Sequence, residues 1–169
     1  MAIFKTLRTS FERLLEIVTV LLMISLVVVV VLAVIYRKAG ASLVWYDEVA
    51  SVMLAWLTYY AAALAALKRA HIGFSGLVDA LPRPWRLALI IVAEILIVAF
   101  FTLLAWVGYQ VVLVLEGVTL ISLPAVSTQL TQSVIPVGAV LFIIAQLLSF
   151  PEVWRRTSSG QTLHEEGHE

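Results

Sequence analysis

The stretch Trp45-Tyr-Asp-Glu48 … Leu67-Lys-Arg-Ala-His71-Ile72 opens with an acidic pair, continues through a mostly apolar run and closes with a basic pair and a histidine. A helix needs roughly 20 predominantly apolar residues to cross a hydrocarbon core about 30 Å thick. This stretch therefore predicts a membrane-spanning helix whose two ends are chemically different, one acidic and one basic.

The composition of the whole chain is that of a membrane protein. Of its 169 residues, 62% are apolar and only 13% are charged, whereas a soluble domain averages about 25% charged residues. The net charge of zero implies no affinity for nucleic acid, and the absence of cysteine excludes disulfides and thiolate metal sites. Four long apolar blocks are candidates for spans: Ile17–Tyr36, Val49–Leu67, Leu87–Leu115 and Val134–Phe150.

These blocks predict an all-α fold, an integral membrane four-helix bundle. We expect a membrane domain over residues 1–156, with spans at about 14–36, 47–69, 86–116 and 132–150. The polar end of the chain, 157–169, is predicted to be a disordered tail on the cytoplasmic side.

The N-terminal residues are predicted to form a short amphipathic segment on the membrane surface that runs into the first span. Apolar side chains recur there at three- and four-residue steps, and Thr9-Ser-Phe-Glu12 has the form of a capping box, which would start a helix.

An even number of spans places both termini on one side of the membrane, and lysine and arginine residues indicate which side that is. With the termini in the cytoplasm, only Arg37 and Lys38 face outward. The nine cytoplasmic basic residues would then be Lys5, Arg8, Arg13, Lys68, Arg69, Arg83, Arg86, Arg155 and Arg156. We therefore predict that both termini are cytoplasmic, that Asp47 and Glu48 face outward and that His71 faces the cytoplasm.

The second span carries two stripes at helical spacing. Small or weakly polar residues form one: Ser51, Ala55, Thr58, Ala62, Ala65 and Arg69. Bulky residues form the other: Met53, Leu57, Tyr60, Leu64 and Leu67. Membrane helices associate where small residues let their backbones approach. The small stripe is therefore predicted to contact the other spans, and the bulky stripe to meet lipid or another protein.

Glu94 is the one acidic residue within the four apolar blocks. Counted from Arg86, it lies roughly 12 Å into the bilayer at 1.5 Å per residue, a depth at which a charge is costly. A proton-relay or ion-coupling carboxylate is one interpretation. A hydrogen bond to a neighbouring helix or to a partner subunit is the other, and we favour it because no further carboxylate or histidine lines up with Glu94. Gln110 and Gln146 are expected to make interhelical hydrogen bonds.

The remaining polar candidates lie near the ends of spans or in the tail. Asp47 and Glu48 could bind a cation or contact a soluble partner, or they could only favour the dipole of the helix that they begin. His71 could sense pH, although a solvated loop histidine is the simpler interpretation. His164-Glu-Glu-Gly-His168 matches the zinc-protease pattern, but it lies in a polar tail with neither the buried helix nor the third ligand that such a site needs.

Several short motifs together resemble the small membrane subunit of tripartite ATP-independent periplasmic (TRAP) transporters, the DctQ family. The resemblance covers roughly Leu15 to Arg156. Its motifs are Trp45-Tyr-Asp-Glu48, Lys68-Arg-Ala-His71-Ile72, Val78-Asp-Ala-Leu-Pro82, Ser122-Leu-Pro124 and Ile135-Pro-Val-Gly138. The family often has a Gly-Ala-Ala-like stretch in the middle of span 2, where this chain has Tyr59-Tyr-Ala-Ala-Ala63.

The resemblance implies a scaffold subunit of a secondary transporter in the bacterial inner membrane. Its implied partners are a large, elevator-type permease subunit of about twelve spans, which would hold the sodium and organic-acid sites, and a periplasmic binding protein that delivers the substrate. Membrane lipid would surround the complex. No cofactor and no enzymatic activity are expected of this chain. The alternative is a stand-alone four-span protein, either a homo-oligomeric transporter or a membrane enzyme.

Six residues are our candidates for assembly or partner contact: Trp45, Asp47, Glu48, Arg69, His71 and Glu94. We expect Glu48→Ala and Arg69→Ala to reduce uptake through assembly or docking while leaving substrate specificity unchanged, because the two residues lie at opposite ends of span 2.

Overall fold

The computed structural model describes residues 2–68 and 82–159 of the chain. Its helices are α1 (Ala2–Lys38), α2 (Tyr46–Leu67), α4 (Arg83–Val114), α5 (Thr128–Gln132) and α6 (Val134–Ser159). Four stretches are long and apolar enough to cross a membrane: Thr6–Lys38 in α1, Tyr46–Leu67 in α2, Pro84–Val114 in α4, and Thr128–Glu152, which combines α5 with most of α6. The predicted all-α, four-span membrane fold is therefore confirmed.

Local sequence explains where these helices begin and end. Gly40 and Gly117 have φ angles of 80° and 78° shortly after α1 and α4, a conformation that other residues adopt only at a cost. Pro82 precedes α4, and Pro84 lies in its first turn, where a missing amide is tolerated. Pro136 lies in the first turn of α6, just after the break that separates α6 from α5.

The N-terminal segment is helical and continuous with the first span. The capping-box pattern at Thr9–Glu12 starts no helix, because α1 begins before it and runs through it. Leu15 of this segment is fully buried and Phe11 packs against the same core. At the other end of the chain, α6 continues through Pro151 to Ser159. Residues 157–159 of the predicted tail are thus helical, and residues 160–169 lie outside the described part.

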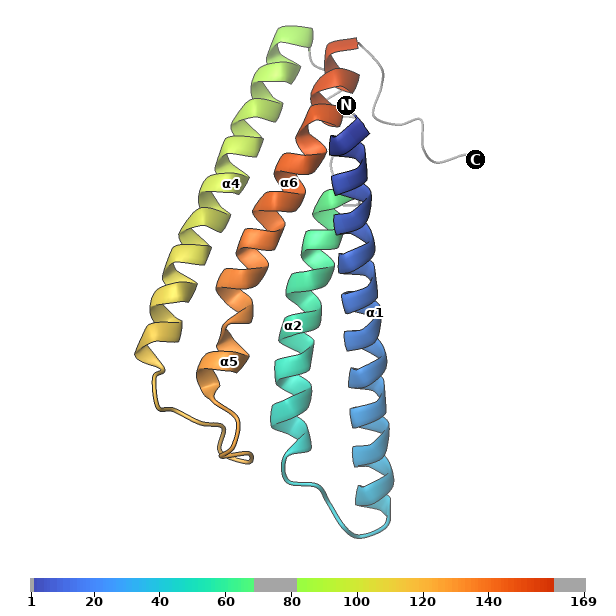
Figure 1. Cartoon of the computed structure of the whole chain (residues 1–169), viewed down its shortest axis with the longest axis vertical. Helices are drawn as coiled ribbons and strands as arrows, with labels where there is room; N and C mark the ends of the chain where they lie inside the picture. The colour runs from blue at the N-terminus through green and yellow to red at the C-terminus, as the bar shows by residue number, and fades with distance from the viewer. Residues whose placement is uncertain (1, 69–81, 160–169) are drawn as a thin grey trace.

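The long helices lie in a row in the order α4, α6, α2, α1 (Figure 1). α6 packs against both α2 and α4, and α1 packs against α2. α6 is accordingly the most buried of the four spans, while α1 and α4 form the two edges of the row. Along the helix axes, the start of α1 and the end of α6 lie at the same end of the bundle (Figure 1).

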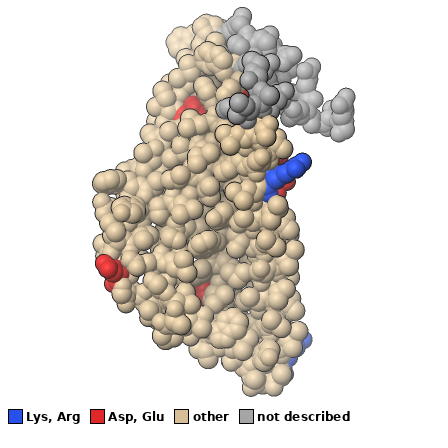
Figure 2. All heavy atoms as spheres, viewed as in Figure 1, with Lys and Arg blue, Asp and Glu red and all other residues tan. Residues whose placement is uncertain are grey.

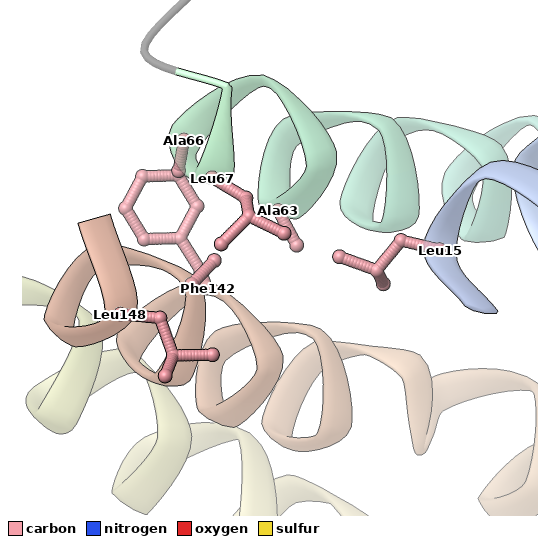
Figure 3. Close-up of a cluster of buried hydrophobic side chains, with 7 residues drawn as sticks. Leu15, Ala63, Ala66, Leu67, Phe142 and Leu148 are labelled. Carbon is pink, nitrogen blue, oxygen red and sulfur yellow. The ribbon is translucent and has the colours of Figure 1, made fainter. Parts of the chain in front are cut away.

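The main core lies toward the end of the bundle, along the helix axes, where α1 starts and α6 ends. Leu15, Ala63, Ala66 and Leu67 meet Phe142, Ala145 and Leu148 there (Figure 3). Phe142 stacks on Phe101 of α4 with ring centroids 3.7 Å apart. Alanines at these positions let α2 and α6 approach closely, which is how membrane helices gain packing energy.

The predicted roles of the two stripes on α2 hold only in part. Ala62 of the small stripe packs against the core, but Ser51, Ala55 and Thr58 are exposed, whereas Leu67 is fully buried and Tyr60 and Leu64 pack against the core. Small residues of α6 also contribute to the close approach. A Cβ added at Gly138 would lie 2.6 Å from the Cβ of Tyr59, so a bulky residue of α2 packs directly on a glycine of α6.

Candidate functional site

Close contacts fix the register of the helices. Tyr59 of α2 lies on Gly138 of α6, and Leu67 packs in the same cluster as Ala145 and Leu148. A Cβ added at Gly108 of α4 would lie 2.7 Å from a side-chain carbon of Ile135. This register places the polar side chains of the four helices in two layers, one on the side of the termini and one on the side of the loop that joins α4 to α5.

The loop-side layer is centred on Glu48, in the first turn of α2. Its carboxylate accepts hydrogen bonds from the backbone amides of Ile121 and Ser122, at 3.2 and 2.9 Å, and from the Ser122 hydroxyl. Both carboxylate oxygens are thereby used. The acid that sequence reasoning offered as a cation ligand or docking residue holds the 115–127 loop to α2.

The 115–127 loop has some regular structure of its own. The amide of Leu120 donates to the carbonyl of Val126 at 3.0 Å, and that of Thr128 donates to Val118 at 2.9 Å. Thr119 and Ser127 form an isolated antiparallel bridge. Glu48 therefore contacts an ordered turn, and it joins the Trp45–Glu48 motif to the Ser122–Pro124 motif.

The turn between α1 and α2 lies in the same layer. The guanidinium of Arg37 donates to the hydroxyl of Tyr46 and lies 5.4 Å from the centroid of its ring. Trp45 is partly buried at the start of α2, and Asp47 is exposed. Of the two acids at the start of α2, Asp47 is thus the more accessible carboxylate and Glu48 the one engaged within the chain.

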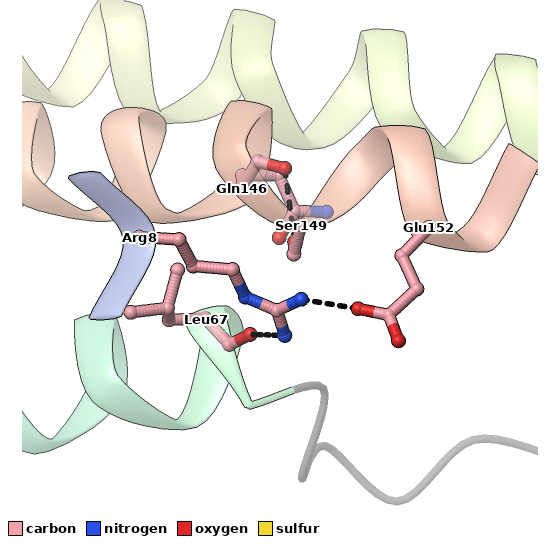
Figure 4. A network of polar contacts seen from close by, with 5 residues as sticks. All are labelled: Arg8, Leu67, Gln146, Ser149 and Glu152. Carbon is pink, nitrogen blue, oxygen red and sulfur yellow. Dashed lines mark hydrogen bonds and ion pairs between the residues drawn. The ribbon is translucent and has the colours of Figure 1, made fainter. Parts of the chain in front are cut away.

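The terminus-side layer joins the end of α2 to α1 and α6. The Lys68 ammonium pairs with Glu16 and lies 3.5 Å from Glu12. The Arg8 guanidinium pairs with Glu152 of α6 and donates to the carbonyl of Leu67 at 3.3 Å (Figure 4). Carbonyls in the last turn of a helix lack intrahelical donors, so cations are favourable there. The hydrogen bond to Glu16 raises the pKa of the Lys68 ammonium above its usual value.

Glu94 belongs to the terminus-side layer as well. It is 9% exposed and accepts a hydrogen bond of 2.9 Å from the side-chain amide of Gln146. The backbone carbonyl of Gln146 accepts a further hydrogen bond, from the Ser149 hydroxyl, at 2.9 Å. An interhelical hydrogen bond was one of the two alternatives for Glu94, and it is present.

Nearly equal lengths of helix separate the two layers. Glu16 and Arg37 are 21 residues apart on α1, Glu48 and Lys68 are 20 apart on α2, and Glu94 precedes Glu116 by 22. At 1.5 Å per residue these lengths are roughly 30–33 Å, about the thickness of a hydrocarbon core. Residues 17–36, 49–67, 95–115 and 128–145 contain no Asp, Glu, Lys, Arg or His. Between the two layers, the helices therefore form an uncharged region about as thick as the hydrocarbon core of a bilayer, which we call the slab.

Sequence reasoning found some members of these layers and missed others. Arg69 and His71 lie outside the described residues, as do His164–His168. Ser122 was noticed only as part of a motif, and the ion pair of Arg8 with Glu152 was not predicted. Both contacts join residues far apart in the chain, so no local sequence pattern predicts them. Among residues 2–68 and 82–159, no group of three His, Cys, Asp or Glu side chains could hold a metal ion.

Comparison with known families gives one result. The family described as tripartite ATP-independent periplasmic transporters, DctQ component, matches residues 26–156, which is well over half of the chain. A search of curated proteins gives no match.

Proposed function

The chain belongs to the DctQ family of TRAP transporter components, and we propose that it is the fixed scaffold on which the large permease subunit of such a transporter is held. Membership makes it a small membrane subunit of a TRAP transporter, in a family of transporter components and not of enzymes. It also implies association with a large permease and with a substrate-binding protein.

The observation that carries the scaffold role is the uncharged slab between the two polar layers. Moving an ion or an organic anion across a membrane requires charged or strongly polar groups along its path. Charged side chains of this chain lie instead at the ends of its spans, where Glu48, Arg8 and Lys68 tie segments together. A chain built in this way is suited to holding a transporting partner.

In this proposal the permease subunit binds sodium and an organic acid and moves as an elevator, while the present chain stays fixed. The positive-inside rule favours cytoplasmic termini in the bacterial inner membrane. The loop-side layer would then face the periplasm, where a binding protein arrives with the substrate. Asp47 and Trp45 are the candidates there for contact with that protein.

Co-expression with the large permease and the binding protein of the same system tests this function. We expect the chain to co-purify with the permease in detergent. In proteoliposomes, uptake should require both membrane subunits and the binding protein, and the chain alone should give none. A chain that isolates as a homo-oligomer and never with the permease would contradict the proposal, and so would uptake by the chain alone.

A further inference from the structure

Three helices continue past the terminus-side layer while α2 ends there. α4 extends from Glu94 back to Arg83, α6 extends from Gln146 to Ser159, and α1 extends from Glu16 back to Ala2. At 1.5 Å per residue each extension is roughly 16–21 Å long. Figure 1 shows α4 and α6 reaching well past the end of α2 at the end of the row that carries the termini.

The extension of α4 has an apolar surface outside the slab. Trp85, Leu89 and Val92 are all exposed, Trp85 by 68%. Their steps of four and three residues place them on one face of the helix, and the next step reaches Leu96, which is exposed within the slab. None of the exposed residues described between Pro84 and Ala93 is charged. The extension of α1 differs, because Thr9, Ser10 and Arg13 are exposed among its apolar residues.

Leu96 lies within the slab, and Val92 and Leu89 lie within the depth of the headgroups, but the membrane does not account for Trp85. If the hydrocarbon ends at the terminus-side layer, Trp85 lies nine residues, or roughly 13 Å, beyond it. The headgroup region adds only about 5–8 Å on each side of the hydrocarbon. A continuous exposed apolar face in water marks a contact with another protein. Charged groups are also few on the broad face of the row in Figure 2.

We propose that the α4 face formed by Trp85, Leu89, Val92 and Leu96 docks the large permease subunit on the side of the termini. The inference rests on the proposed function and adds to it the surface that is used. Of the two partners that the family implies, the binding protein belongs on the opposite side, which leaves the permease. Continuity of the face from Leu96 to Trp85 suits a partner that lies partly within the bilayer and partly outside it.

Site-specific photo-crosslinking in the assembled complex tests this surface, with benzoylphenylalanine in place of either Trp85 or Leu7. Leu7 is the control on α1, because it is 57% exposed and precedes Glu16 by nine residues, as Trp85 precedes Glu94. We expect an adduct with the large permease from position 85 and none from position 7. Equal adducts from both positions, or adducts from position 85 with lipid alone or with a second copy of the chain, would overturn the proposal.

Co-purification gives a second measurement. We expect Trp85→Ser combined with Leu89→Ser to lower the recovered permease by roughly tenfold, the scale of truncating interface side chains that carry binding energy, while Leu7→Ser leaves it unchanged. Thermal unfolding of the double variant reports whether it folds. If it does not fold, the photo-crosslinking experiment tests the docking surface instead. Full recovery of permease with the double variant would refute the proposed docking surface but not the proposed function. Failure of the unmodified chain to bind permease would refute the proposed function.

Discussion

The carboxylate of Glu48 accepts two backbone amides and a hydroxyl from a loop more than seventy residues away. A carboxylate with several donors binds more firmly than a neutral acceptor, and its place in the first turn of α2 is favoured by the helix dipole. Because one residue holds the loop-side layer together, substitutions there should affect the shape of the loop before they affect the spans.

Glu48→Ala is expected to release the 115–127 loop, since three donors lose their acceptor. Limited proteolysis of the chain in detergent should then cut within this loop several times faster than in the unmodified chain. Uptake should fall while substrate specificity stays unchanged. Asp47→Ala is the matched control, because Asp47 is an exposed neighbour in the same turn. Equal rates of cleavage for all three chains would contradict the role of Glu48.

Gly138 is a position where α2 and α6 approach closely. Gly138→Ala places a methyl group 2.6 Å from the Cβ of Tyr59, which belongs to a side chain anchored in a helix and cannot move far. Overpacking of this kind costs about 1–3 kcal/mol of stability. Val137→Ala, at an exposed neighbouring position, should cost less. Thermal unfolding of the two variants in one detergent measures the difference, and an unchanged midpoint for Gly138→Ala would refute the close approach.

Lys68 provides a test through pH. Its folded-state pKa is raised above the usual value of 10.5, first by its hydrogen bond to Glu16. The stabilisation that it contributes is therefore fully present below pH 10.5 and is lost as pH rises through the folded value. The difference in unfolding midpoint between the chain and Lys68→Met should be constant from neutral pH up to that region and should disappear above it. A difference that vanishes near neutral pH would contradict the ion pair.

At the scale of helices, the spans were predictable and their neighbours were not. Long apolar runs such as Val49–Leu67 announce a spanning helix, because no other structure satisfies the backbone in lipid. The same apolar character covers every face of such a helix, so periodicity does not tell which face meets a neighbour. The small stripe on α2 was only partly informative for this reason. The informative small residue was Gly138, which was quoted only as part of a motif.

The ends of α1, α2 and α6 are joined by Arg8, and the pair that it forms with Glu152 can be tested by exchange of charge. Arg8→Glu and Glu152→Arg should each destabilise the chain, and the double variant should recover part of the loss. Because both side chains are partly exposed, the coupling should be in the range of about 0.2–1 kcal/mol. Recovery should be incomplete, since Arg8 also donates to the carbonyl of Leu67. Losses that merely add in the double variant would show that the pair is not coupled.

At the scale of the whole molecule, the two polar layers predict how the chain sits in a bilayer. Glu94 is level with Lys68 through Gln146 and Leu67, so it lies at the edge of the slab and not deep within it. Counting from Arg86 predicts a greater depth, and the two placements differ because α4 starts beyond the end of α2. The candidate site was predictable in its residue types, but its division into layers required the register of four helices.

Cysteine accessibility measures this placement in a chain that has no cysteine of its own. Ala88, Ala93 and Ala99 are all exposed on α4. In the chain reconstituted without permease, Ala88→Cys and Ala93→Cys should react with a membrane-impermeant maleimide, while Ala99→Cys should not. The side from which the reagent acts also reports the orientation of the termini. Protection of position 88 together with 99 would place the bilayer edge at Arg86 instead.

The position of α6 between α2 and α4 has a consequence for biosynthesis. α6, which connects α2 to α4, is synthesised after the other three long helices. α1 and α2 can therefore pair as a hairpin early. α4 enters the bilayer before α5 and α6, its principal neighbours within the chain, have been made. Nascent chains that stop before Val134 should therefore hold α4 unpartnered and exposed to membrane proteases. Insertion of α6, rather than insertion of the first three spans, is then the step that protects a newly made chain from proteolysis.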